Sequence, residues 1–218
     1  MDKSLLPMFI SDAFGLVFIV VWIVGYTRQG VKPEENLRRL AEQLGLEFVA
    51  RPRSVTGILR GKTVEVFTEI SGWGGPGRQT SEPTISARPT QDTGLTFQLV
   101  TRTSFSKIGE EIGGWHSLAT CDAVFDAAWF VQSNRPEYFV VALLPELRGK
   151  LLAVHAAGLK GRFELAEFLV KYIPLDDSFS DANFCARIPA ILDILCDLAE
   201  IAEVAPSGGA PGLAGGAS

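Results

Sequence analysis

The stretch Val55–Ile70, VTGILRGKTVEVFTEI, decides the fold class of this chain. It consists of two runs rich in β-branched residues on either side of Arg60-Gly61-Lys62. In the second run apolar and polar residues alternate, which places Val64 and Val66 on one face and the glutamates on the other. This period of two, interrupted by a glycine-containing turn, predicts a β-hairpin with one buried face.

The flanking segments carry further helix and strand signals. Pro33-Glu34-Glu35 is typical of a helix start and Gly45 of a helix end. A helix broken at Pro145 is expected over 136–154, and a short one over 105–112. The further expected strands are Leu46–Val49, Thr84–Arg88 paired with Leu95–Thr101, and Asp126–Gln132. Arg162–Ala166 and Phe168–Ile173 are expected as a late hairpin or as two short strands. Helices and strands without regular βαβ alternation predict an α+β domain with a largely antiparallel sheet.

The clearest helical pattern lies near the C-terminus. An apolar stripe occupies one face and acidic residues occupy the opposite face, with Pro189 expected in the first turn. The stripe consists of Ile188, Ile191, Leu192, Leu195, Ala199 and Ala202, and the acidic face of Asp193, Asp197, Glu200 and Glu203. From residue 205 the chain reads APSGGAPGLAGGAS, which predicts a disordered tail.

The N-terminal residues contain a long apolar run in which Asp12 is the only charge. A helix over residues 8–26 would be ~28 Å long, close to the ~30 Å hydrocarbon core of a bilayer. An uncleaved transmembrane anchor is therefore expected, with a cleaved signal peptide and a buried helix as alternatives. The expected organisation is a short segment 1–7, an anchor 8–26, a linker 27–33, a domain 34–204 and a tail 205–218.

Basic residues differ between the two sides of this run. Lys3 precedes it, whereas a cluster follows it, made up of Arg28, Lys32, Arg38 and Arg39. The positive-inside rule then predicts an outward N-terminus and a cytoplasmic domain, with the four residues at the lipid surface. Asp12 is expected either to contact a membrane-protein partner or to mark the outer interface. The net charge of −5 argues against a nucleic-acid partner.

No motif predicts a catalytic residue, a metal site or a cofactor. The stretch 72–77, GWGGPG, matches the G-x-G-x-x-G pattern, but Pro83 begins an extended run where a phosphate-binding helix is needed. Trp73 at the tip of this loop is a candidate partner contact instead. His116 and Cys121 are close in sequence but lack an orienting group and an oxyanion site, so Cys121 is interpreted as a core residue.

Two further groups of residues receive structural interpretations. The three cysteines, Cys121, Cys185 and Cys196, include no C-x-x-C pair and are interpreted as free thiols. Four basic residues around the first strands are interpreted as a solvated face or as contacts to lipid headgroups: Arg51, Arg53, Arg60 and Lys62.

Several short motifs occur in a characteristic order. They are Leu44-Gly45-Leu46-x-Phe48, Val55-Thr56-Gly57, Arg60-Gly61-Lys62-x-Val64, Phe125-Asp126-x-x-Trp129 and Leu144-Pro145-Glu146-Leu147-Arg148. In this order the chain resembles, over residues 37–203, a loose group of uncharacterised, membrane-anchored bacterial proteins. The resemblance implies an anchored domain and assigns no activity or functional residue.

Two functional hypotheses follow from the sequence. The first is a non-enzymatic accessory or scaffold subunit of a membrane protein assembly. The second is a membrane-anchored hydrolase or ligand-binding domain whose site has no recognisable motif.

Overall fold

A computed structural model describes residues 33–71, 80–102 and 117–206 of the chain. The described part begins with a helix over residues 33–44. The strands are β1 Glu47–Ala50, β2 Arg53–Leu59, β3 Lys62–Ser71, β4 Thr80–Arg88, β5 Phe97–Thr101, β6 Trp129–Ser133, β7 Gly161–Ala166 and β8 Leu169–Pro174. The remaining helices are α3 Ala123–Ala128, α4 Pro136–Ala142, α5 Pro145–Ala156 and α6 Ala182–Val204.

The strands form one antiparallel sheet with the order β1-β2-β3-β4-β8-β7-β5-β6. The hairpin β7–β8 is inserted between β4 and β5, so the connection between those two strands must pass around two others. Ala87 of β4 pairs with Val170, and Phe97 of β5 pairs with Leu165. The β4–β5 connection and the β7–β8 turn therefore lie at the same end of the sheet.

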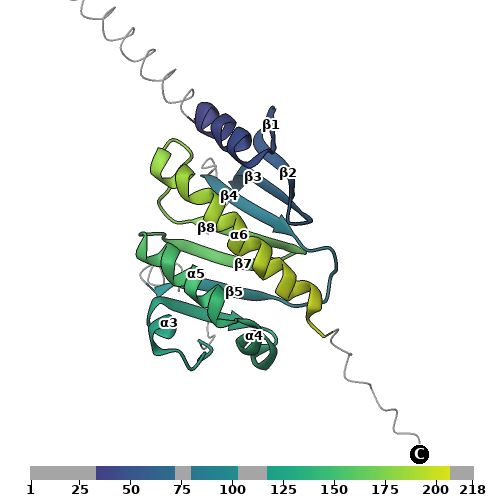
Figure 1. The fold of residues 1–218 in the computed structure, drawn as a ribbon, viewed down its shortest axis with the longest axis vertical. Coiled ribbons are helices and arrows are strands. Elements are labelled where there is room, and N and C mark those ends of the chain that lie inside the picture. The colour runs from purple at the N-terminus through teal and green to yellow at the C-terminus, as the bar shows by residue number, and fades with distance from the viewer. Residues whose placement is uncertain (1–32, 72–79, 103–116, 207–218) are drawn as a thin grey trace, which may run out of the picture.

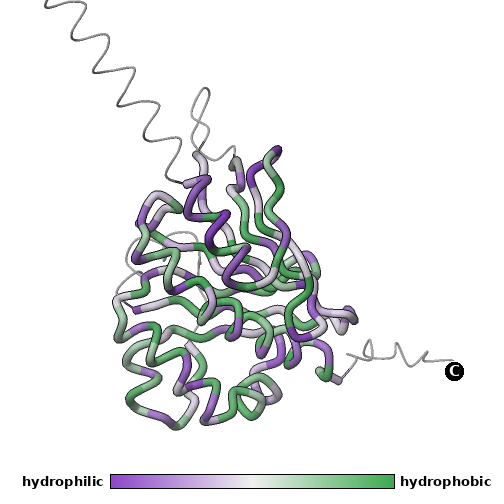
Figure 2. Tube along the Cα trace, turned by 45° about the horizontal axis from the view of Figure 1, so that its top comes forward, coloured by the Kyte–Doolittle hydropathy of each residue, from purple (hydrophilic) through white to green (hydrophobic). Residues whose placement is uncertain are grey.

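The labelled helices pack on one face of this sheet (Figure 1). The longest, α6, contacts β3, β4 and β8, and α5 lies beside it. The sheet residues that face these helices are buried, as at Val66, Leu99 and Phe163, whereas their neighbours along each strand point the other way. Figure 2 shows this alternation of hydrophobic and hydrophilic residues along the strands. The domain is thus a two-layer α+β structure with a main core between sheet and helices and a smaller buried cluster at Val100 and Phe130.

Several predicted elements are confirmed. The hairpin β2–β3 has a two-residue turn in which Arg60 and Gly61 both have positive φ, 51° and 77°. Val64 and Val66 are completely buried, as the alternation predicted. The first helix ends at Gly45, whose φ is +64°, and the helix break at Pro145 and the hairpin β7–β8 are also present.

Three local predictions are wrong. Thr84–Arg88 and Leu95–Thr101 are both in strands but do not pair, because β7 and β8 separate them. Of the predicted strand Asp126–Gln132, residues 129–132 are in β6 but 126–128 end α3, because the Asp122 carboxylate accepts from the Val124 and Phe125 N–H groups and caps a helix there. Pro189 lies inside α6, because that helix begins at Ala182 with Asp181 as its cap.

The expected transmembrane architecture is corrected by the structure. Among residues 33–71, 80–102 and 117–206, no helix combines the length and the apolar character needed to cross a bilayer. The longest of these helices, α6, has acidic side chains along its length. The fold is therefore described as an α+β sheet domain, without the transmembrane helix and without the single-pass membrane localisation that were expected from the sequence. The expected anchor 8–26, the helix 105–112 and the tail from 207 lie outside the described residues.

Candidate functional site

Of the site residues predicted from the sequence, the structure describes two, Arg38 and Arg39. Arg38 and Arg39 form ion pairs on the surface of their own helix with Glu34 and Glu35. The Arg38 guanidinium also lies 4.4 Å from the ring centroid of Phe48. The other predicted contact residues, Asp12, Arg28, Lys32 and Trp73, lie outside the described residues.

The three cysteines are free, as predicted, but their burial differs from the expectation. Cys121 is exposed with a φ of 61° rather than buried in the core. Burial raises the pKa of the Cys185 and Cys196 thiols to about 11. Because the thiolate is the nucleophile, these two groups are poor candidates for covalent chemistry near neutral pH. Within the described residues, no group of three or more His, Cys, Asp or Glu side chains is arranged to hold a metal ion.

The acidic face of α6 carries an ion-pair network. Arg60, from the β2–β3 turn, lies 2.7 Å from both Asp193 and Asp197 and 2.8 Å from Glu200. Lys150, from α5, lies 2.7 Å from the same two aspartates. The hydrogen bond to Asp197 is the largest cause that raises the pKa of Arg60. The interpretation as a solvated basic face is therefore wrong for Lys62, which is buried against Glu203, whereas Arg60 is exposed and also pairs with α6.

Glu203, near the end of α6, connects three segments of the chain. Its carboxylate pairs with Lys62 of β3 and accepts hydrogen bonds from the N–H and the hydroxyl of Thr90. Burial by itself would raise the pKa of Glu203, but these donors lower the pKa below its ordinary value. This carboxylate holds the start of the β4–β5 connection against the helix.

The rest of the β4–β5 connection is fixed at several more points. The Thr93 hydroxyl donates to the Ala202 carbonyl at 2.7 Å. The Arg135 guanidinium donates to the carbonyls of Thr93 and Pro206, and Asn134 Nδ2 donates to the Gly94 carbonyl at 2.8 Å. Residues 89–96 thus form a loop that is held in place from two sides, by α6 and by the end of β6.

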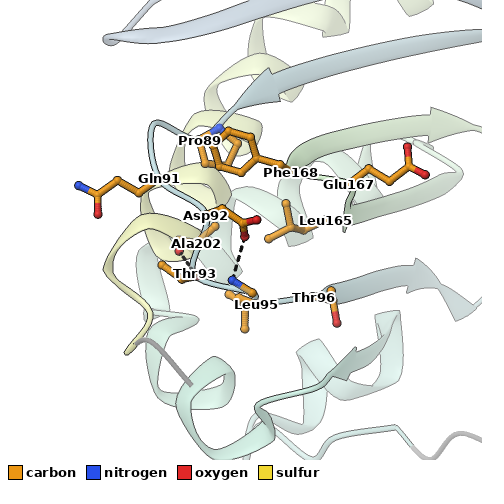
Figure 3. A pocket seen from close by; sticks show the side chains of 11 residues that line it. Pro89, Gln91, Asp92, Thr93, Leu95, Thr96, Leu165, Glu167, Phe168 and Ala202 are labelled. Atoms are coloured by element: carbon orange, nitrogen blue, oxygen red, sulfur yellow. Dashed lines mark hydrogen bonds between the residues drawn. The ribbon is translucent and has the colours of Figure 1, made fainter. Parts of the chain in front are cut away.

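A hollow of about 430 Å³ lies between this loop, the β7–β8 turn and α6. In Figure 3 the ring of Phe168 lies beside Pro89, and Leu165 forms part of the floor. The Asp92 side chain points into the same space, and Asp92 Oδ1 accepts from the Gly94 N–H at 2.9 Å. The lining residues are Pro89, Gln91, Asp92, Thr93, Gly94, Leu95, Thr96, Leu165, Glu167, Phe168 and Ala202. The volume lies in the range of binding sites for small ligands and single side chains, roughly 300–1,000 Å³.

The β7–β8 turn beside the hollow has an unusual composition. Its two central residues, Glu167 and Phe168, both have positive φ, 51° and 61°. This is the geometry of a turn in which asparagine and glycine are favoured. A side chain with a Cβ in the left-handed region costs roughly 1–2 kcal/mol per residue. The turn therefore presents an aromatic ring and a carboxylate at the hollow at the expense of stability.

The sequence contained only weak signals of this site. The run Pro89 to Gly94 is rich in turn-forming residues, which marks a loop but not its function. Glu167 and Phe168 do not have turn character, and Phe168 was assigned to a strand. The hollow is formed by segments far apart in the sequence, which meet because β7 and β8 are inserted between β4 and β5.

Comparisons with known proteins identify a protein of similar fold but no family for this chain. No family model matches the chain, and no curated protein matches it. Among solved structures, the chain is similar to the crystal structure of the mycobacterial trehalose monomycolate transport factor A, TtfA, with a TM-score of 0.52 and 12% sequence identity. The match covers 82% of this chain and 98% of that one. At this level of identity the two proteins share a fold.

Proposed function

We propose that this domain is a non-catalytic accessory factor that binds another protein of a transport assembly, and that the hollow at residues 89–96 and 165–168 is part of the contact. The observation that carries the proposal is the combination of a loop fixed by Glu203, Asn134 and Arg135 with a strained turn that presents Phe168. A binding surface that is already ordered loses little conformational entropy on association. Aromatic side chains are enriched among the residues that dominate binding energy.

The structural neighbour supports the same role. That protein is named as a transport factor. Fold alone does not determine function, so the weight of the proposal rests on the hollow. That the partner is a membrane protein, as the sequence suggested, stays a prediction, because Asp12, Arg28 and Lys32 lie outside the described residues.

A second candidate is a ligand-binding domain for a small molecule. The volume of the hollow favours it, since about 430 Å³ suits a small organic ligand. In the protein as isolated from its host, the first candidate expects a partner protein at the hollow. The second expects a small molecule there.

The test is a comparison of variants purified from the native host under mild conditions. Wild type is expected to retain a stoichiometric protein, and Phe168→Asn is expected to lose it, because asparagine keeps the backbone geometry of the turn and removes the ring. Glu42→Gln, an exposed change on the helix 33–44, serves as the control and should retain the partner. Retention of the partner by Phe168→Asn, or its absence from wild type, would contradict the proposal. A small molecule released from wild type and missing from Phe168→Asn would favour the second candidate.

A further inference from the structure

The charged residues that line the hollow are of one sign. Asp92 and Glu167 line it, and its lining includes no lysine or arginine. In the part of the chain that the structure describes, no cation pairs with either carboxylate. A cation close to the loop is Arg135, whose guanidinium donates to the Thr93 and Pro206 carbonyls and whose Nη2 lies 3.6 Å from the position of a Cβ on Gly94. By contrast, Glu164 of β7 pairs with Arg162, and Glu203 pairs with Lys62.

The two carboxylates occupy different places. Asp92 points into the hollow, and its hydrogen bond to the Gly94 N–H fixes its orientation (Figure 3). Glu167 lies on the β7–β8 turn, and both residues are exposed. A charge held in a fixed direction gives affinity for one bound cation, whereas a charge on an unrestrained side chain mainly increases the association rate.

The wall next to Asp92 is apolar. Phe168 is half-buried beside Pro89, and Leu165 is 6% exposed. Lysine and arginine carry a long aliphatic stem that packs on apolar surface while the charged end reaches a polar group. The face of an aromatic ring also attracts such a cation directly. An apolar wall with an aromatic ring and a carboxylate at its end matches this kind of side chain.

We infer that the hollow binds a basic peptide segment of the partner, with the stem of a lysine or arginine against Phe168 and Pro89 and its cation at Asp92. This inference rests on the proposed function, because it names the chemistry of the protein that the accessory factor binds. It also gives a reason for the strained turn. Asparagine and glycine at 167 and 168 would relieve the backbone, but only a large aromatic residue at 168 supplies the wall.

The inference is tested by titrating the full chain with a short, terminally blocked peptide that has arginine at its centre and alanine on both sides. The titration is followed by the amide resonances of residues 89–96 and 165–168. These signals should shift saturably. The same peptide with glutamine at its centre should bind about tenfold more weakly, which corresponds to the loss of one charged contact.

Equal binding of the two peptides, saturable shifts that map elsewhere, or no saturable shift would overturn the inference. Shifts that depend on protein concentration without peptide would instead indicate a second copy of this chain in the hollow, and would also overturn it.

Three variants refine the result. Asp92→Asn keeps the acceptor for the Gly94 N–H and removes the charge, so the arginine peptide should bind about tenfold more weakly. Glu42→Gln removes an exposed carboxylate outside the hollow and should leave the affinity unchanged. The double variant Glu167→Asn/Phe168→Gly should lose binding and yet unfold at a higher temperature, because it relieves the turn. Unchanged binding of the arginine peptide to Asp92→Asn would contradict the inference. A double variant that is less stable than wild type and still binds the peptide would also contradict it.

These results can be separated from a failure of the proposed function. If a stoichiometric partner is retained by wild type and lost in Phe168→Asn, while the arginine and glutamine peptides bind alike, the accessory role stands and the basic peptide is wrong. If the arginine peptide binds at Asp92 but no partner protein is retained from the host, the hollow recognises a cation and the accessory role is wrong.

Discussion

Gly161, the first residue of β7, stands where two other segments come close to the backbone. A Cβ atom at this position would overlap the Ile173 carbonyl oxygen and lie 2.8 Å from Tyr172 Oη. Ile173 lies in the neighbouring strand β8, and the Tyr172 hydroxyl donates to the Lys160 carbonyl at 2.9 Å. Neither group can move without disturbing β8, which makes this position a sensitive test of how closely the two strands pack.

Gly161→Ala is expected to lower the free energy of unfolding by about 1–3 kcal/mol or more, because the backbone must shift to accept the methyl group. The matched control is Gly149→Ala in α5, where the structure leaves open space around the added methyl. That change should raise the stability by roughly 0.5–1 kcal/mol, since alanine is the better helix residue. Chemical denaturation of both variants gives the comparison. Equal midpoints for Gly161→Ala and wild type would show that the strands pack less closely than described.

At the scale of elements, the acidic face of α6 does more than keep the helix soluble. Its side chains bind the β2–β3 turn through Arg60, helix α5 through Lys150, and the β4–β5 loop through Glu203. Arg60 is about a third exposed, so its ion pairs are screened and each contributes little. Lys62 and Glu203 are 9% and 14% exposed, which makes this pair the one with a measurable effect on stability.

Glu203→Gln is expected to destabilise the domain by about 1–3 kcal/mol near pH 7, because it leaves the Lys62 ammonium buried without a counter-charge. The pKa of Glu203 is held below its ordinary value of 4.5 in the folded chain. Its stabilising contribution is therefore complete above that value and is lost as the pH falls through the lower, folded pKa. The difference in stability between wild type and variant should shrink accordingly between about pH 5 and pH 3.

Denaturant titrations at several pH values measure this difference. Glu42→Gln is again the control, since this glutamate is exposed. A difference between wild type and Glu203→Gln that stays constant down to about pH 3 would mean that the Lys62–Glu203 pair does not act as an ion pair in solution.

At the same scale, local patterns predicted local structure well and pairing between distant strands poorly. The hairpin β2–β3 could be predicted because alternation and turn lie within a few residues of each other, whereas β7 and β8 were indicated by their strand patterns alone. The pairing of β4 with β8 and of β5 with β7 joins strands that are far apart in sequence, and nothing in the local pattern of Thr84–Arg88 indicates its partner. The acidic face of α6 has the same sequence pattern as a face in contact with solvent. Charge alone does not tell whether basic side chains of another element lie opposite it.

At the scale of the whole molecule, the candidate site is a consequence of topology. Because β7 and β8 lie between β4 and β5, the connection over residues 89–96 must cross the end of that hairpin. The hollow is the space between the crossing loop and the turn below it. A motif such as the glycine-rich stretch 72–77 can be recognised within a few residues, whereas a surface formed by strand order leaves no such local pattern.

The whole-molecule prediction is that residues 33–206 fold without the remaining segments. Within the described residues, the main core extends from Leu37 in the first helix to Ala205 after α6, and a smaller cluster contains Val100 and Phe130. A chain that begins at Pro33 and ends at Pro206 should therefore show one cooperative transition, with the same midpoint by circular dichroism and by tryptophan fluorescence. This chain has three tryptophans, Trp73, Trp115 and Trp129, and the contribution of the completely buried Trp129 reports on the tertiary core rather than on helix content. A chain that ends at Asp181 is the control and should fail to fold, because α6 supplies much of the buried surface against β3, β4 and β8. Transitions that do not coincide, or aggregation of the chain 33–206, would show that residues outside this range are needed to complete the fold.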